Sequence, residues 1–382
     1  MCYSQAKIRT AARAGCGLLL ALISAAPARA AAPLAPPPPA VDPAYLCTPF
    51  DQRQGLAGCP NAGPGATAAR LQSFQLPWDL PLLPAAFPEK SDLPVNRSYA
   101  RAAPDTPVFN QPQPPAGSLP VRQLGIGQNV GFLYVSLTTN PGLTWTQINE
   151  REYVRTDALV PVGPSDFQGA KVTTQPQRAL AWLVQTVRPF TQPAWSAPQQ
   201  KRALERYTLV QVYATLESGS DTWLLVGPHA WVEHRAVGLV QLTAPPPGVS
   251  GRWIDVNLYE QTLAAYEDER MVYTTLVSSG ISQWVTHPGL FQIYEKLLKD
   301  DMGGAFAADQ SDYYLIEDVP WVMYYDGSRA LHGAYWHNKF GFQKSHGCVN
   351  LSPRDALWLY EWADTETWVW VHDPSGRTPT KF

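Results

Sequence analysis

The stretch SHGCVN (residues 345–350) places a lone cysteine beside a histidine and a glycine. A thiol is a weak nucleophile until it ionises, and a nearby imidazole lowers its pKa and shuttles its proton. His346 stands two residues before Cys348, so in an extended segment the two side chains share one face. Gly347 leaves the backbone uncrowded, and its amide and that of Cys348 are candidate donors to an oxyanion. This pattern predicts a cysteine nucleophile.

A second stretch, LHGAYWHN (residues 331–338), supplies another imidazole next to a glycine. Twelve residues separate His332 from Ser345, which is enough for the chain to return on an adjacent strand. We therefore expect His332 to lie near Cys348. Either His332 or His346 can be the catalytic base, and the residue pattern does not choose between them.

The SHGC block with its upstream His-Gly pair resembles the signature of the L,D-transpeptidases, the YkuD-type catalytic domain. The resemblance covers roughly residues 251–373. Within it, THPGLF (residues 286–291) is similar to the family's Thr-Pro-x-Gly turn, with the proline displaced by one position and His287 in its place. The spacer between His332 and Ser345 is slightly shorter than in the family pattern. The resemblance implies a mainly-β fold: a YkuD-like β-sandwich with a short helix after the cysteine.

The resemblance also implies a reaction. Cys348 would attack the carbonyl of the meso-diaminopimelate residue in a donor tetrapeptide stem of peptidoglycan, releasing D-alanine and leaving a thioester. An amine of a second stem would then resolve the thioester to a 3→3 cross-link. His332 and His346 are the expected catalytic partners, with no metal or other cofactor. The remaining candidates support the oxyanion site or the loop (Gly347, Gly333, Ser345, Asn350) or line the substrate groove (Tyr335, Trp336, His337).

Other interpretations remain open at this level. Water as the acceptor would make the protein an L,D-carboxypeptidase or amidase that uses the same thiol. A non-catalytic wall-binding protein would retain the fold without turnover. A zinc site formed by Cys348 and the two histidines is disfavoured, since the sequence offers no fourth ligand and no Cys-x-x-Cys pair.

Residues 250–373 are expected to form the catalytic domain, because the run APPPG (residues 244–248) is a rigid boundary before them. A helix is expected after Ser352, a favourable N-cap, with Pro353 in the first helical position and Asp355 placed to complete a capping box. Apolar and alternating segments predict strands at 253–258, 262–266, 271–277 and 368–371, and a C-terminal tail at 374–382.

Residues 118–245 are expected to form a β domain with an internal repeat. Segments 145–159 and 223–237 each contain a Trp, then an aromatic-Val pair, then Ala and an aliphatic residue at matching spacings. This pattern looks like bacterial SH3-like domains and predicts an SH3-like β-barrel region with two repeats. Chance similarity between two unrelated β-segments is the alternative.

The N-terminal residues 1–30 are predicted to be an export signal. A basic start precedes the short apolar run 15–26, and ARA (residues 28–30) fits a cleavage site. The run is too short to span a bilayer comfortably, so we expect a periplasmic or cell-envelope protein without a membrane span after cleavage.

Residues 31–117 are rich in Pro, Ala and Gly and are expected to be a linker. Cys47 and Cys59 lie within it, and an oxidising compartment would favour a disulfide between them, with two free thiols as the alternative. That pairing would leave Cys348 unpaired. The net charge of -3 gives no basic face for nucleic acid, and the expected partner is a peptidoglycan stem peptide.

Overall fold

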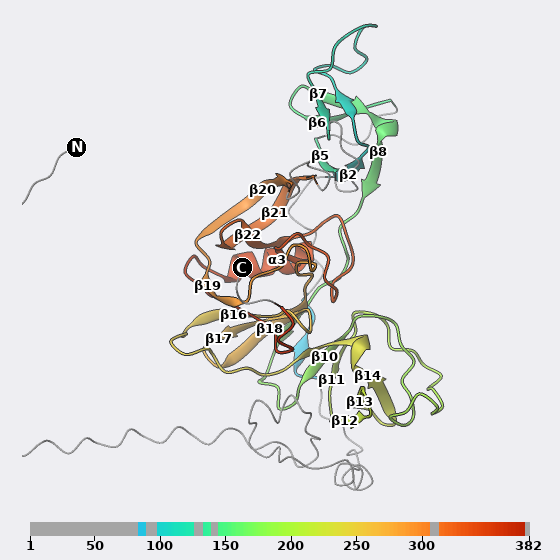
Figure 1. The fold of residues 1–382 in the computed structure, drawn as a ribbon, viewed down its shortest axis with the longest axis vertical. Coiled ribbons are helices and arrows are strands. Elements are labelled where there is room, and N and C mark those ends of the chain that lie inside the picture. The colour runs from blue at the N-terminus through green and yellow to red at the C-terminus, as the bar shows by residue number, and fades with distance from the viewer. Residues whose placement is uncertain (1–82, 89–97, 126–132, 139–143, 306–312, 379–382) are drawn as a thin grey trace, which may run out of the picture. The chain divides into compact units, whose positions relative to one another are not determined.

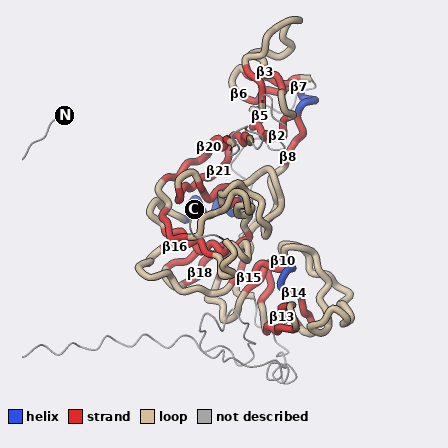
Figure 2. The backbone as a smooth tube through the Cα atoms, viewed as in Figure 1, coloured by secondary structure: helices blue, strands red, loops and turns tan. Residues whose placement is uncertain are grey.

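The computed structural model describes residues 83–88, 98–125, 133–138, 144–305 and 313–378. Strands dominate these residues, as Figure 2 shows in red. The described helices are α3 (Pro353–Trp362) and two short 3-10 helices, η1 (Thr156–Ala158) and η2 (His234–Ala236). The predicted mainly-β class is therefore confirmed. The expected export signal and the Cys47–Cys59 disulfide lie outside the described residues.

One seven-stranded sheet contains the four strands predicted from apolar and alternating segments, now seen as β16, β17, β18 and β24. Its order is β1-β9-β18-β17-β16-β24-β19, with β16 parallel to β24 and antiparallel to β17. The bounds are β1 (Ala85–Ala86), β9 (Ala170–Val172), β16 (Arg252–Asn257), β17 (Thr262–Glu267), β18 (Arg270–Leu276), β19 (Gly289–Gln292) and β24 (Trp368–His372).

A second seven-stranded sheet contains both histidine-glycine stretches. Its order is β23-β22-β21-β5-β2-β8, and β20 pairs with β21 to form the long hairpin of Figure 1. The bounds are β2 (Ser98–Ala102), β5 (Leu133–Leu137), β8 (Leu159–Val162), β20 (Glu295–Gly304), β21 (Tyr314–Asp326), β22 (Arg329–Gly333) and β23 (Val349–Leu351). The parallel pairing of β22 with β23 places the two stretches side by side.

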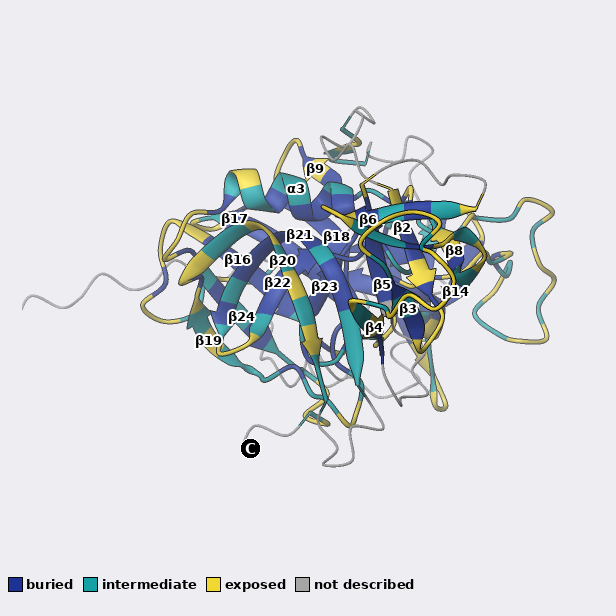
Figure 3. Ribbon diagram, turned by 90° about the horizontal axis from the view of Figure 1, so that it is seen from above, coloured by how far each residue is buried: buried dark blue, intermediate teal, exposed yellow. Residues whose placement is uncertain are grey.

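The two sheets share one hydrophobic core with α3. Figure 3 shows buried residues in dark blue along β16, β18 and β21. The core draws Ile254 and Val256 from the first sheet, Met323, Leu331 and Val349 from the second, and Ala356 and Leu359 from α3. Burial of apolar area between the facing sides of the two sheets is the main stabilising force in such a sandwich.

The predicted capping of α3 is half correct. Ser352 is the N-cap, and its hydroxyl accepts a hydrogen bond from the Asp355 amide at 3.2 Å. The Asp355 carboxylate does not complete a capping box with the Ser352 amide. It accepts instead from the Gly169 amide (2.6 Å), the Tyr273 hydroxyl (2.8 Å) and the Thr275 hydroxyl (2.6 Å). These partners lie on other elements, which a local pattern cannot reveal.

Two smaller β-units precede the sandwich in the chain. The first contains β2, β5 and β8 together with β3 (Thr106–Val108), β4 (Arg122–Leu124), β6 (Trp145–Asn149) and β7 (Glu152–Arg155). The second contains β10 (Leu180–Leu183), β11 (Leu209–Gln211), β12 (Ala214–Ser218), β13 (Asp221–Gly227), β14 (Ala230–Glu233) and β15 (Val237–Val240).

The two copies of the sequence repeat fold alike. The hairpin β6–β7 leads through η1 into β8, and the hairpin β13–β14 leads through η2 into β15. The SH3-like assignment itself stays a prediction.

Ordered structure begins before the predicted boundary at residue 118. Strands β2 and β3 lie inside the expected linker, yet they pair with β5, β8 and β4. Strand β9, inside the expected SH3-like region, instead pairs with β18 of the first seven-stranded sheet. High Pro and Ala content masks short strands, because these residues have low β-propensity and weaken the alternation.

Candidate active site

Strands β22 and β23 bring His332 and Cys348 to neighbouring positions. His332 is paired with Asn350 in the parallel register, and Cys348 directly precedes β23, two residues before Asn350. Alternate residues of an extended segment point to one face. The pairing therefore agrees with the expected return of the chain beside His332.

Cys348 is a free, half-buried cysteine. Its Sγ lies 3.8 Å from the Ser328 carbonyl oxygen, and the side chain packs among aromatic residues that include Tyr314 and Tyr324. Burial raises the pKa of the Cys348 thiol, and this outweighs the opposing effects of an Ala330 backbone hydrogen bond and the Arg329 charge. The expected lowering of the thiol pKa is therefore wrong, because the thiolate loses more solvation than its neighbours restore.

Residues 345–348, called the nucleophile loop after the predicted role of Cys348, are held by the hydroxyl groups of Ser345 and Thr286. The Ser345 hydroxyl donates to the Cys348 carbonyl oxygen (2.5 Å) and accepts from the Gly347 amide (3.1 Å). The Thr286 hydroxyl donates to the Gly347 carbonyl oxygen at 2.8 Å. Ser345 thus has the loop-supporting contacts predicted for it, whereas the engaged Gly347 amide argues against the predicted oxyanion role. Gly347 has φ +117°, which requires glycine.

His332 is only 2% exposed, and its ring is oriented by backbone. Nδ1 lies 3.3 Å from the Gly333 carbonyl oxygen, so this nitrogen carries the proton and Nε2 is left as an acceptor. Burial lowers the pKa of His332 to about 4. Gly333 therefore supports the site through its carbonyl oxygen, which orients the His332 ring. A Cβ at Gly333 would also lie 3.0 Å from Pro320 and 3.3 Å from Pro353.

His346 lies between two aromatic rings. Its ring centroid is 4.0 Å from that of Trp284 and 4.6 Å from that of Tyr314, and it is stacked on Tyr314 at 10°. Tyr314 belongs to β21, so these rings connect the β20–β21 hairpin to the nucleophile loop.

The three groove candidates have different surroundings. Tyr335 is 1% exposed, stacks on Tyr99 at 3.6 Å and donates to the Glu317 carbonyl, so its expected place in an open groove is wrong. Trp336 is half-buried, with its ring 5.7 Å from that of His332. Tyr335 lies in the loop after β22, and its large aromatic ring is buried in a hydrophobic cluster with Tyr99 and Val322.

His337 contacts a predicted loop residue, Asn350. The Lys339 amide lies 3.2 Å from His337 Nδ1, and the Asn350 side-chain nitrogen Nδ2 lies 3.0 Å from His337 Nε2. Burial, with the charges of nearby Lys344 and Lys339, lowers the pKa of His337 to about 3. His337 and Asn350 thus form one neutral hydrogen-bonded unit.

Sequence reasoning missed a charged cluster behind the loop. Asp326 Oδ2 lies 2.8 Å from His287 Nδ1 and 3.5 Å from an Arg329 nitrogen. The Arg329 Nε donates to the Val285 carbonyl at 3.1 Å. The proximity of Arg329 to His332 in sequence is the one signal that could have suggested it.

The buried state of His332 predicts a pH effect on stability. The pKa of His332 falls from 6.5 to about 4 on folding, so between these values only the unfolded chain binds the proton. Stability from this residue is complete above about pH 6.5 and is lost as the pH falls through 4, by about 3 kcal/mol.

Urea unfolding of the parent and of His332→Gln across this pH range measures that effect. The difference between the two free energies of unfolding should change by about 3 kcal/mol. A constant difference would contradict the prediction. His337→Gln gives a second comparison, because the pKa of His337 is lowered to about 3 and its contribution should also fall below about pH 6.5 and keep falling to about pH 3.

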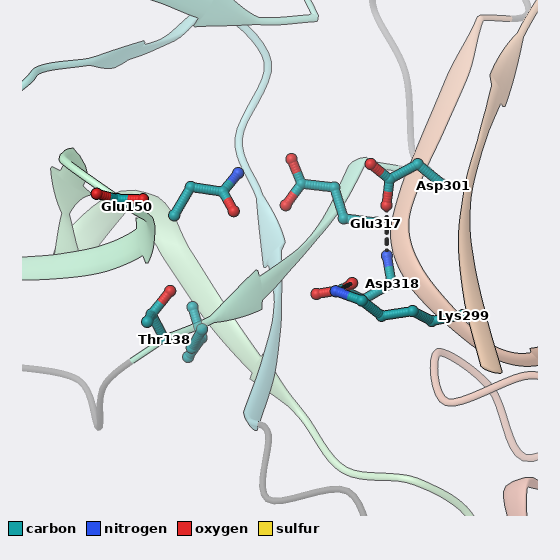
Figure 4. Close-up of a pocket in the computed structure, with 8 residues that line it drawn as sticks. Thr138, Glu150, Lys299, Asp301, Glu317 and Asp318 are labelled. Carbon is teal, nitrogen blue, oxygen red and sulfur yellow. Dashed lines mark hydrogen bonds and ion pairs between the residues drawn. The ribbon is translucent and has the colours of Figure 1, made fainter.

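A polar cavity of about 430 Å³ lies beside the β20–β21 hairpin, and neither Cys348 nor any of the histidines described above lines it. Figure 4 shows Glu317, Asp301 and Asp318 from the hairpin opposite Glu150 and Thr138. The Asp301 carboxylate accepts from the Asp318 amide at 2.7 Å. Within the described part of the chain, no group of three or more His, Cys, Asp or Glu residues is arranged to hold a metal ion. No helix among those residues is long and apolar enough to cross a membrane.

Comparison with known proteins finds a match for the segment that contains these residues. Residues 251–371 match the family model of the L,D-transpeptidase catalytic domain, YkuD. The predicted resemblance is therefore confirmed over nearly the expected range.

Individual proteins are similar to parts of this chain. The Bacillus subtilis (strain 168) protein named "Putative L,D-transpeptidase YciB" is 27% identical over 128 residues, which are 28% of this chain and 59% of that protein. An L,D-transpeptidase structure from Stackebrandtia nassauensis is 26% identical, with a TM-score of 0.27, covering 37% of this chain and 62% of the other. The catalytic domain of the E. faecium L,D-transpeptidase is 24% identical, with a TM-score of 0.29. The match covers 33% of this chain and 99% of that domain. The chain thus spans about three-fifths of the length of the first two relatives.

Proposed function

We propose that this protein is an exported peptidoglycan L,D-transpeptidase with Cys348 as its nucleophile. The observation that carries the proposal is a free, half-buried cysteine two residues before the register partner of a carbonyl-oriented histidine, within a segment that matches the L,D-transpeptidase catalytic domain. A stem peptide of peptidoglycan is the proposed donor, and an amine of a second stem is the proposed acceptor.

His332 is the better candidate for the base. Its Nδ1 is bonded to the Gly333 carbonyl, which leaves Nε2 unprotonated, and the low pKa keeps the ring neutral at physiological pH. His346, held between Trp284 and Tyr314, has the surroundings of a residue that supports the loop. Because burial raises the thiol pKa, the resting pair is a neutral thiol and a neutral imidazole.

The reaction then proceeds in two balanced halves. As sulfur bonds to the donor carbonyl carbon, His332 takes the thiol proton and returns it to the leaving D-alanine amine, which leaves a thioester. The acceptor amine attacks this thioester and gives its proton to His332, the C–S bond breaks, and His332 returns the proton to the departing sulfur to restore the thiol. Hydrolysis by water in place of the amine gives the carboxypeptidase outcome.

Incubation of the purified protein with a disaccharide-tetrapeptide tests this function. We expect a cross-linked dimer, detected by mass spectrometry, together with free D-alanine in equal amount. Tripeptide alone would favour carboxypeptidase action, and unchanged substrate would refute both activities. A parallel reaction with EDTA should give the same products, because the proposed chemistry uses only Cys348 and His332.

A further inference from the structure

We propose that Arg329 is a positioning residue that stabilises the Cys348 thiolate as it forms. This inference rests on the proposed role of Cys348 as the nucleophile. Arg329 is the first residue of β22, whose fourth residue is His332. It therefore connects the strand of the proposed base to the loop of the proposed nucleophile.

The guanidinium group is held in a fixed place. Nε donates to the Val285 carbonyl at 3.1 Å, and a second nitrogen lies 3.5 Å from the Asp326 carboxylate. The same Asp326 oxygen lies 2.8 Å from His287 Nδ1. The Arg329 side chain is 25% exposed and that of Asp326 is 22% exposed, so water screens this charge only in part.

The arginine side chain lies directly against the backbone of the nucleophile loop. A Cβ placed at Gly347 would be 3.2 Å from Arg329 Nε, 3.8 Å from its Cδ and 3.5 Å from the Val285 oxygen. Glycine at 347 thus permits the close approach, in addition to its positive φ. The Ser328 carbonyl oxygen lies 3.8 Å from the Cys348 sulfur, and the Ala330 backbone forms a hydrogen bond with the thiol. Both chain neighbours of Arg329 therefore contact Cys348.

The other titratable groups around the Cys348 sulfur do not supply the permanent positive charge that would stabilise a thiolate. The titratable groups near Cys348 come from β21, β22 and the nucleophile loop and include Tyr314, Tyr324, Tyr325, Asp326 beside Arg329, Arg329, His332 and His346. The tyrosines are neutral at physiological pH because burial raises the pKa of each. His332 is neutral because burial lowers its pKa. Of these groups Arg329 is the one with a permanent positive charge, and its charge lowers the thiol pKa against the effect of burial.

The rate at which iodoacetamide alkylates Cys348, measured against pH, tests the proposal. Only the thiolate reacts, so the midpoint of the profile reports the thiol pKa, and the uncharged reagent avoids steering by the altered charge. The chain contains five cysteines, so the Cys348 peptide is followed by mass spectrometry. We expect Arg329→Gln to raise the midpoint by about one pH unit and to slow alkylation at pH 7 about tenfold.

Three further variants separate charge from packing. Arg329→Lys keeps the charge, and we expect it to restore at least about half of the midpoint shift. Arg329→Met removes the charge but keeps an aliphatic side chain, and it should behave like Arg329→Gln. Arg270→Gln, at an exposed ion pair with Glu267, should leave the midpoint unchanged. Circular dichroism at each pH confirms that the variants are folded.

A midpoint of a folded Gln or Met variant that stays within about 0.2 pH units of the parent would overturn the proposal. Midpoints that order the variants by side-chain size, with Lys no better than Met, would also overturn it. The alkylation needs no peptidoglycan, so this result is independent of turnover. A shifted midpoint in a protein that forms no peptide product would refute the proposed function and leave the role of Arg329 intact.

Discussion

Replacement of Cys348 by Ala should abolish turnover of the disaccharide-tetrapeptide while the protein stays folded. Every covalent step of the proposed reaction uses this sulfur, so we expect the rate of D-alanine release to fall at least about a thousandfold. The side chain is half-buried and small, so the loss of stability should be about 1 kcal/mol. Mass spectrometry of the products and a thermal melt measure the two effects.

The control for this variant is Gln343→Ala, an exposed residue two positions before Ser345. It should retain turnover within about twofold of the parent, because surface substitutions rarely change stability or geometry. Intact parent protein mixed with substrate should also carry an acyl group on the Cys348 peptide. Substantial turnover by the folded alanine variant would show that another residue is the nucleophile.

Replacement of Asp355 by Ala should cause the largest loss of stability among the variants considered. The carboxylate is fully buried and accepts hydrogen bonds from Gly169, Tyr273 and Thr275, which lie on other segments of the chain. Its loss leaves three buried donors without this acceptor, and each unsatisfied group costs about 1–3 kcal/mol. We expect the free energy of unfolding to fall by about 3–5 kcal/mol.

Asp364→Ala is the matched control, because this aspartate lies just past the end of α3 and its side chain is 75% exposed. Its ion pair with Arg252 is screened by water, and its removal should change stability by less than about 0.5 kcal/mol. Urea unfolding at neutral pH compares the two. A loss below about 1 kcal/mol for Asp355→Ala would mean that the buried charge costs as much as its hydrogen bonds return.

The strands and the helix of the sandwich could be predicted because their signals are local. Alternating apolar residues marked β16 and β17, and Ser352 with Pro353 marked the start of α3. The strands β2 and β3 were missed, because they lie in a Pro- and Ala-rich segment and form only by pairing with distant strands.

The candidate site was predictable in its composition and not in its electrostatics. Cys348, His332 and His346 all stand within short motifs, so their identities could be listed without the fold. The direction of the thiol pKa was wrong and the interior place of Tyr335 was missed, because both depend on burial by other elements. The Arg329 charge was overlooked, since nothing in the motifs connects it to residues 285 and 347.

The sequence by itself determined the thiol, the two imidazoles and the glycine beside the sulfur, because these residues lie within two short segments. Only the tertiary structure decided that the His332 ring is bonded to a backbone carbonyl and that Arg329 lies against Gly347. It also decided that Asp355 connects α3 to Gly169 and β18 through hydrogen bonds. Those three facts depend on which distant segments meet and how much water they exclude. Burial and long-range contact set the pKa values and the geometry, and a local pattern of residues specifies neither.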